Sequence, residues 1–100
     1  IDIPDHRNKH AVVGLTRQLA HEFGPFGITV NSVAPGFIRS NPSSELQWES
    51  YGPDGQAALV QRIALQRLGT AQDIANGVLF FASELGSFVN GQVIQVDGGR

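Results

Sequence analysis

The sequence predicts an α/β fold, more specifically one end of a doubly wound parallel sheet. Two observations lead to this class. Helix-like and strand-like segments alternate along the 100 residues, and the two strand-like segments are joined by a long connection that contains a helix. Connections of this kind join parallel strands, which occur in sheets that helices cover on both faces. The predicted order is helix, strand, lid, helix, strand.

The first predicted element is a helix over residues 5–23. Its apolar side chains recur at helical spacing, as Val12, Leu15, Leu19 and Phe23. Asp5 is the expected N-cap, and the run GPFG at 24–27 supplies the stop. Residues 28–34 are then β-branched and apolar without clean alternation, as in a strand covered on both faces.

Residues 39–57, called the lid below, are rich in turn-forming residues and are predicted to hold little regular structure. A short helix over about 56–66 is expected to close the lid. A second long helix follows over about 70–84, with Thr70 as N-cap and Asp73 at the capping-box position. The final predicted strand, 91–96, ends at Asp97.

Two parallel strands alone leave two edges and bare faces, so the chain is expected to be a fragment or an obligate assembler. The sequence also lacks an initiator Met and a signal-peptide pattern at its start. We therefore expect one part of a larger domain. The apolar surface of the second long helix is wide enough to bury two faces.

Composition excludes several function classes. Seven Lys+Arg against nine Asp+Glu give a net charge of −2, which offers no basic stripe for nucleic acid. The longest apolar run, 78–82, is far shorter than the roughly 20 residues of a membrane span. The absence of cysteine excludes disulfides and thiolate chemistry and suits a cytoplasmic setting. We expect neither a nucleic-acid nor a membrane partner.

Four runs, in this order, resemble the classical short-chain dehydrogenases/reductases: KHAVVGLTR at 9–17, GITVNSVAPGFI at 27–38, RLG at 67–69 and GQVIQVDGG at 91–99. The resemblance covers essentially the whole chain and is to the C-terminal part of that family's Rossmann-type domain. It implies hydride transfer between NAD or NADP and an alcohol or carbonyl substrate. The Gly-rich pyrophosphate turn and the family's catalytic Ser have no counterpart here, so the N-terminal nucleotide-binding half is expected to be absent.

The resemblance assigns Lys9, by its register to Gly14, as the family's Lys, which binds the cofactor ribose. The plain alternative is a solvated surface cation. In the family a Tyr lies four residues earlier, one helical turn away, but this chain has Asp5 there. An ionised carboxylate cannot donate the proton of carbonyl reduction. Asp5 is thus a doubtful catalytic residue or simply the N-cap, and His6 is a poorly aimed substitute acid.

The resemblance further assigns a nicotinamide-binding loop at Pro35, Gly36, Ile38 and Ser40. Ligands of open α/β sheets bind beyond the carboxyl ends of the strands, where this loop lies. Gly36 is expected to let the backbone approach the ring, and Ser40 stands where the family commonly has a cofactor-binding Thr. The alternative is an ordinary turn that ends the strand.

Within and beside the lid, apolar side chains are predicted to wall an apolar or ring-shaped substrate: Phe37, Leu46, Trp48 and Tyr51. Near the N-terminus, potential metal ligands gather as Asp2, Asp5, His6 and His10. The two histidines have ligand spacing, but no Glu lies between them in the hydrolytic-zinc pattern. No metal site is predicted.

The resemblance implies a homodimer or homotetramer that pairs helices 9–23 and 71–84 and strand 91–96, and the wide apolar faces favour the same conclusion. The alternative occupant of these faces is the missing half of the same domain. A second function also stays open. Because Asp5 replaces the expected Tyr, the chain could instead be a non-catalytic binding or assembly module, or a remnant.

Overall fold

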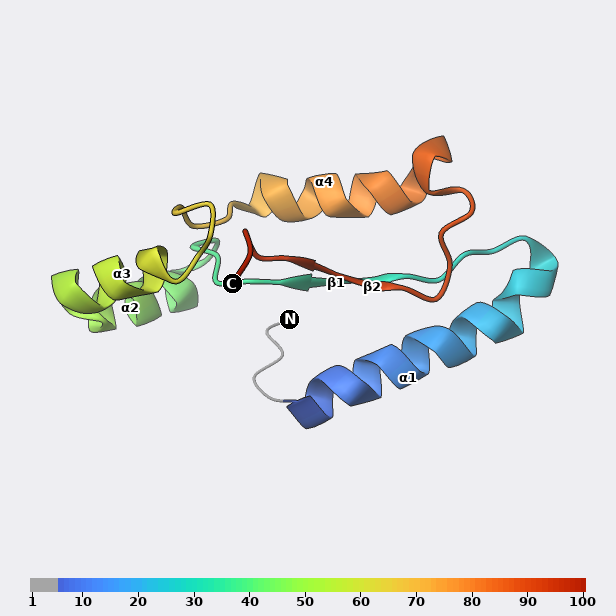
Figure 1. Cartoon of the computed structure of the whole chain (residues 1–100), viewed down its shortest axis with the longest axis horizontal. Helices are drawn as coiled ribbons and strands as arrows, with labels where there is room; N and C mark the ends of the chain where they lie inside the picture. The colour runs from blue at the N-terminus through green and yellow to red at the C-terminus, as the bar shows by residue number, and fades with distance from the viewer. Residues whose placement is uncertain (1–5) are drawn as a thin grey trace.

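A computed structural model describes residues 6–100, and Figure 1 shows their arrangement in three layers. The central layer is a parallel pair of strands, β1 (Ser32–Pro35) and β2 (Val93–Val96). Helix α1 (His6–Phe23) covers one face and α4 (Ala71–Ala82) covers the other. This layering confirms the predicted α/β class and the parallel pairing.

The strands are shorter than predicted, because side-chain amides take the place of backbone hydrogen-bond partners at their amino ends. Ser32 pairs with Val93 as the first residue of each strand. Before that point, the Asn31 amide donates to the Val89 carbonyl and accepts from the Gln92 N–H, at 2.9 and 3.0 Å. Asn90 accepts from the Val30 N–H in the same way. Side-chain amides that bond the backbone compete with sheet hydrogen bonds, so residues 28–31 stay outside the strand.

Helix α1 ends as its sequence predicts, whereas its predicted N-cap, Asp5, lies outside the described residues. A 3₁₀ turn, Gly24–Phe26, follows the helix, and Gly27 closes it in the left-handed region at φ 76°. Buried Thr16 ties the helix to the sheet. Its hydroxyl donates to the Val12 carbonyl, so the Ser32 hydroxyl is the donor in the 2.8 Å bond between Ser32 and Thr16.

The prediction of an irregular lid is wrong, because the segment folds into two short helices. They are α2 (Pro42–Ser50) and α3 (Gly52–Gln61), and the latter replaces the helix expected over 56–66. Asn41 and Ser44 form a capping box in which each side chain accepts from the other's backbone N–H. Pro42 then suits the first helical turn. The residues interpreted as turn formers are therefore a helix start.

Helix α4 begins with the predicted capping box between Thr70 and Asp73. It ends at Ala82, two residues early, where a second 3₁₀ turn over Glu84–Gly86 takes over. Arg67 adds a contact that the sequence did not predict, since its Nη1 lies 2.9 Å from Asp73 Oδ2. Asp73 thus joins the loop before α4 to the helix start.

This cap predicts a loss of stability in acid. The Arg67 hydrogen bond and the Thr70 N–H lower the pKa of Asp73 from 3.8 to about 2. Because the folded pKa lies below the unfolded one, the stabilisation is complete above pH 3.8 and disappears as the pH falls to about 2. Thermal unfolding measured stepwise in pH should show this loss. The Asp73→Asn variant should show a shallower decline over the same interval, and an unchanged decline would contradict the assignment.

Few side chains of the described region are buried, and large apolar side chains remain outside. Buried apolar residues are Ala20, Ala34, Leu59 and Ile63. Side chains more than half exposed include Leu15, Phe26, Val78, Leu79, Leu85 and Phe88. Within residues 6–100, no helix combines the length and the apolar character that a membrane crossing requires.

Candidate functional site

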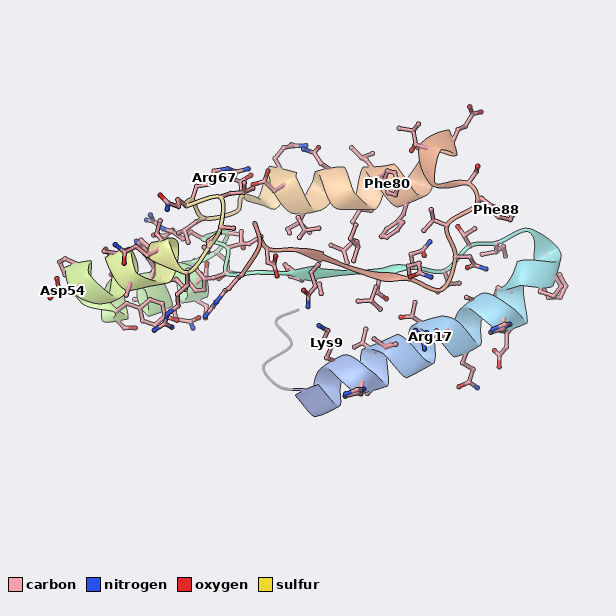
Figure 2. The ribbon with its side chains drawn as sticks, in the orientation of Figure 1. Lys9, Arg17, Asp54, Arg67, Phe80 and Phe88 are labelled. Atoms are coloured by element: carbon pink, nitrogen blue, oxygen red, sulfur yellow. The ribbon has the colours of Figure 1, made fainter. Side chains whose placement is uncertain are left out.

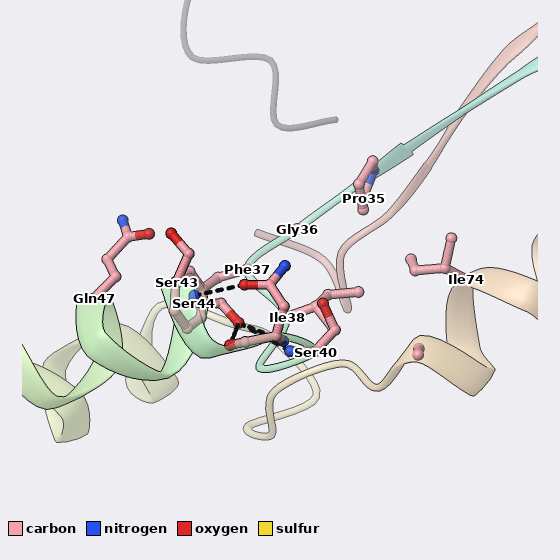
Figure 3. Close-up of a pocket in the computed structure, with 11 residues that line it drawn as sticks. Pro35, Gly36, Phe37, Ile38, Ser40, Ser43, Ser44, Gln47 and Ile74 are labelled. Carbon is pink, nitrogen blue, oxygen red and sulfur yellow. Dashed lines mark hydrogen bonds between the residues drawn. The ribbon is translucent and has the colours of Figure 1, made fainter.

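The loop that follows β1 separates two pockets at the carboxyl end of the strands. The first, called the loop pocket, has a volume of about 490 Å³ and lies between this loop and the starts of α2 and α4 (Figure 3). The loop contributes Pro35, Gly36, Phe37, Ile38 and Ser40 to its wall. The structure therefore brings together all four residues that the resemblance assigns to nicotinamide binding. Their cofactor role stays a prediction.

The second cavity, called the Lys9 pocket, has a volume of about 350 Å³. Figure 2 shows the Lys9 side chain pointing from α1 toward the strands. The walls come from Lys9, the 34–37 segment, Gln47 and Tyr51, with Gln95, Asp97 and Arg100 on the C-terminal side. Lys9 thus lies beside the candidate nicotinamide loop. Residues 35–37 and Gln47 line both pockets and form the partition between them.

Gly36 is required by a contact that the sequence did not reveal. Its N–H donates to the Val96 carbonyl at 3.2 Å, which extends the strand pairing by one bond. A Cβ on Gly36 would lie 2.9 Å from the Asp97 Cβ and 3.1 Å from its Cα. The resemblance gives one expected reason for glycine at this position, which is the close approach of the backbone to a cofactor. The structure supplies a second reason, which is the close passage of the two strand ends.

Only part of the predicted substrate wall lines these two pockets. Phe37 and Tyr51 do, with ring centroids 5.9 Å apart. Trp48 instead stacks on Phe37 with centroids 6.1 Å apart, and neither Trp48 nor the exposed Leu46 lines the two pockets. Because α2 is helical, residues four apart share a face, so Gln47 and Tyr51 point to the Lys9 pocket together.

Gln47 is one of the pocket residues that the sequence analysis did not predict; Gln95, Asp97 and Arg100 are others. The signal for Gln47 was its spacing of four from Tyr51, which carries meaning only once this segment is known to be a helix. The irregular lid expected from the turn-forming residues concealed it. The Gln47 Nε2 atom donates to the Tyr51 hydroxyl at 2.7 Å.

An ion pair fixes the outer face of α2. Arg39 donates two hydrogen bonds to the Glu45 carboxylate, at 2.9 and 2.7 Å. Its guanidinium carbon lies 5.2 Å from the centroid of the Trp48 ring. The hydrogen bond from Arg39 lowers the pKa of Glu45 below its ordinary value. Arg39 therefore ties the end of the loop after β1 to α2.

The remaining site predictions are not settled by the structure. Asp5, at the position of the expected Tyr, and Asp2 lie outside the described residues, and the side chain of His6 is not described. Among the residues that the structure describes, no three His, Asp or Glu side chains come together as metal ligands.

Comparison with known proteins identifies the family. The family model described as enoyl-(acyl carrier protein) reductase matches residues 6–100. The 3-oxoacyl-[acyl-carrier-protein] reductase of Rickettsia felis is 41% identical over 92 residues, covering 92% of this chain and 36% of that protein. An uncharacterised short-chain type dehydrogenase/reductase of Sinorhizobium fredii is 43% identical over 91 residues, covering 91% and 34%.

Solved structures agree with these relatives. The 3-oxoacyl-[acyl-carrier protein] reductase of Brucella melitensis superposes with a TM-score of 0.78 at 36% identity, covering 93% of this chain and 33% of that one. A protein of Beutenbergia cavernae, assigned as an NAD(P)-dependent gluconate 5-dehydrogenase and crystallised with NADP, gives 0.76 at 39%, covering 92% and 36%. The chain spans about a third of the length of these relatives. It belongs to the classical short-chain dehydrogenase/reductase family, as a C-terminal part of that domain.

Proposed function

We propose that this chain is part of an oxidoreductase that transfers hydride between NAD or NADP and an alcohol or carbonyl substrate. One observation carries the proposal. Lys9 from α1 and the loop after β1 line one pocket, at the end of the sheet where α/β proteins bind ligands. In this proposal the chain supplies the ribose-binding Lys9, the nicotinamide loop at 35–40, the lid and the surfaces for assembly.

The residues present fit one end of a dinucleotide. The loop pocket offers an apolar wall from Phe37, Ile38 and Ile74 beside the Ser40 hydroxyl, a mixture that suits a ring bearing a carboxamide. The Lys9 ammonium is a donor for ribose hydroxyls. Both glycines at the C-terminus, Gly98 and Gly99, have positive φ and open no helix. This pair of glycines is therefore not a pyrophosphate cradle of the helix N-terminal kind.

When bound, the cofactor would supply or accept the hydride. The work of this chain is to hold the nicotinamide end in place, through Lys9 on one side of the partition and the 35–40 loop on the other. Phe37, which lies in the partition, would keep water from the face of the nicotinamide ring that it covers.

Saturation-transfer NMR on the purified chain tests this proposal, with NADH and NADPH as separate ligands. We expect the nicotinamide protons and those of its ribose to receive the most saturation, and the adenine protons the least. This gradient follows because the chain carries the loop but no adenine-binding half. A uniform signal, a stronger adenine signal or no transfer would overturn the proposal.

Assembly through helices α1 and α4 and strand β2 is part of the proposal, as a homodimer or homotetramer. Its support is the exposure of Leu15 on α1, Leu79 on α4 and Ile94 on β2, at 57, 60 and 41%. The same exposure favours the second candidate function, a non-catalytic assembly module. Light scattering with size-exclusion chromatography measures the assembly. Oligomers that show no nicotinamide contact would favour the module. The cytoplasmic setting stays a prediction.

A further inference from the structure

The dipeptide Asn-Gly occurs twice in the chain, and the structure places the two copies in different surroundings. The first copy, Asn76 and Gly77, lies inside α4. The second copy, Asn90 and Gly91, lies in the loop that leads into β2, where Asn90 is exposed. In this dipeptide the backbone nitrogen of glycine can attack the side-chain amide carbon of asparagine, because glycine has no Cβ that obstructs the approach. The same reactive groups are therefore present in a helix and in a loop.

The second copy lines a cavity of about 260 Å³ together with two basic side chains of α1. Arg17 and His21 are four residues apart and share one face of the helix. Gly91 lies against that face, since a Cβ on it would come 3.4 Å from the Ala20 Cβ and 3.9 Å from the Arg17 Cα. Among the described residues, no acidic side chain lines this cavity. A proton acceptor and a fixed positive charge therefore lie beside Asn90 and Gly91.

Hydrogen bonds to Val30 hold both reacting groups of the second copy. The Val30 N–H donates to Asn90 Oδ1 at 2.9 Å and so polarises the side-chain carbonyl. Negative charge develops on this oxygen when a nucleophile attacks the amide carbon, so the donor stabilises that charge. The Gly91 N–H donates to the Val30 carbonyl at 2.9 Å. Attack therefore requires the opening of this second bond, which lies outside the β1 strand.

The first copy is held more firmly. The Gly77 N–H belongs to the hydrogen-bond ladder of a 12-residue helix, and Gln72 Nε2 donates to Asn76 Oδ1 at 2.9 Å. The cavity that Asn76 lines contains Arg67, but that guanidinium is paired with Asp73 at 2.9 Å. Attack inside α4 requires the helix to unwind. Local opening of a loop costs less free energy than local unfolding of a helix, so the second copy is the more reactive one.

We propose that the cavity lined by Arg17 and His21 is a self-modification site, in which Asn90 loses its side-chain amide as ammonia. The reaction does not depend on the proposed oxidoreductase function. His21 takes the proton of the Gly91 N–H as a bond forms from this nitrogen to the Asn90 Cγ. The bond from Cγ to Nδ2 then breaks, and ammonia leaves with the proton that His21 returns. Water opens the resulting succinimide ring and leaves aspartate or isoaspartate at position 90.

The product changes the amino end of β2 in two ways. The new carboxylate lies beside Arg17 and His21, where positive charge stabilises it. Isoaspartate also adds a carbon to the backbone between Val89 and Gln92, the two residues that the Asn31 amide bonds at 2.9 and 3.0 Å. The added carbon moves one of these partners away from Asn31. Modification therefore loosens the start of the strand pair and limits how long the fold lasts.

Peptide mass spectrometry tests the proposal on the whole chain. The chain is incubated in neutral buffer made with oxygen-18 water and is then digested in ordinary water. Cleavage after Glu84 separates the two copies of the dipeptide. Ring opening places one labelled oxygen in each modified peptide, so the reaction is distinguished from aspartate that was present before. We expect Asn90 to be modified about tenfold faster than Asn76, because the loop opens more readily than the helix.

Three variants separate the cavity from the dipeptide. His21→Gln removes the proton acceptor and should slow modification of Asn90 by about tenfold or more. Arg17→Gln removes the positive charge and should slow it by about three- to tenfold. His10→Gln is the matched control, because His10 lies on the same helix and does not line this cavity. It should leave the rate unchanged. The rate at Asn76 reports on the fold of each variant, since unwinding of α4 would raise it.

Urea provides the last comparison, because it removes the cavity and keeps the sequence. In the unfolded chain, Asn90 and Asn76 should react at equal rates, and His21→Gln should have no effect. Equal rates at Asn90 and Asn76 in the folded chain would overturn the inference. So would an unchanged rate at Asn90 in either His21→Gln or Arg17→Gln.

Discussion

Replacing Gly36 with alanine should lower the free energy of unfolding by about 1–3 kcal/mol, the range for forcing an extra methyl group into a filled space. The added Cβ would lie 2.9 Å from the Asp97 Cβ and 3.1 Å from its Cα, and one of these atoms belongs to the backbone. Gly36 does not have a positive φ, so the cost comes from contact and not from backbone strain. Denaturant unfolding followed by Trp48 fluorescence measures it.

Gly14→Ala is the matched control. A Cβ at Gly14 would meet nothing within 4 Å, and the residue lies inside α1. Alanine there should stabilise the chain by about 0.5–1 kcal/mol, because glycine is unfavourable in a helix interior. Equal changes in the free energy of unfolding at the two glycines would contradict the proposed close contact between a Cβ at position 36 and Asp97. The Gly36 variant should also weaken nicotinamide saturation, since both pockets share this residue.

Replacing Lys9 with alanine should weaken binding of NADH by about 10- to 100-fold, the cost of a lost hydrogen bond to a charged group. Lys9 comes from α1 and lines one pocket with the candidate nicotinamide loop, so its loss removes the contribution that the described side chains of α1 make to the Lys9 pocket. The measurement is the NADH concentration that gives half of the maximal saturation of the nicotinamide protons.

Arg17→Ala controls for the loss of a positive charge. Arg17 lies on the same helix and lines neither the loop pocket nor the Lys9 pocket. The Arg17→Ala substitution removes one positive charge, as Lys9→Ala does, and should change the affinity for NADH less than twofold. Similar weakening in both variants would mean that Lys9 acts only through net charge, as a surface cation would.

Several elements could be predicted from the sequence because their signals are local. The apolar spacing in α1 and the GPFG stop at 24–27 are adjacent in the sequence. The capping box from Thr70 to Asp73 spans four residues, so the start of α4 was predicted correctly. The lid was predicted incorrectly although its cap, at Asn41, is equally local. Ser, Asn and Pro favour turns and helix starts alike, and the choice depends on what the following residues contact.

By itself, the sequence determined the α/β class, the parallel pairing and the family, because periodicity, caps and ordered motifs are properties of short segments. Only the tertiary structure decided which distant residues share a site. It placed Tyr51 and Gln47 beside Lys9, set Gly36 against Asp97, and bonded Thr16 to Ser32. Contacts between distant segments depend on how helices and strands stack, and no local pattern of side chains encodes that arrangement.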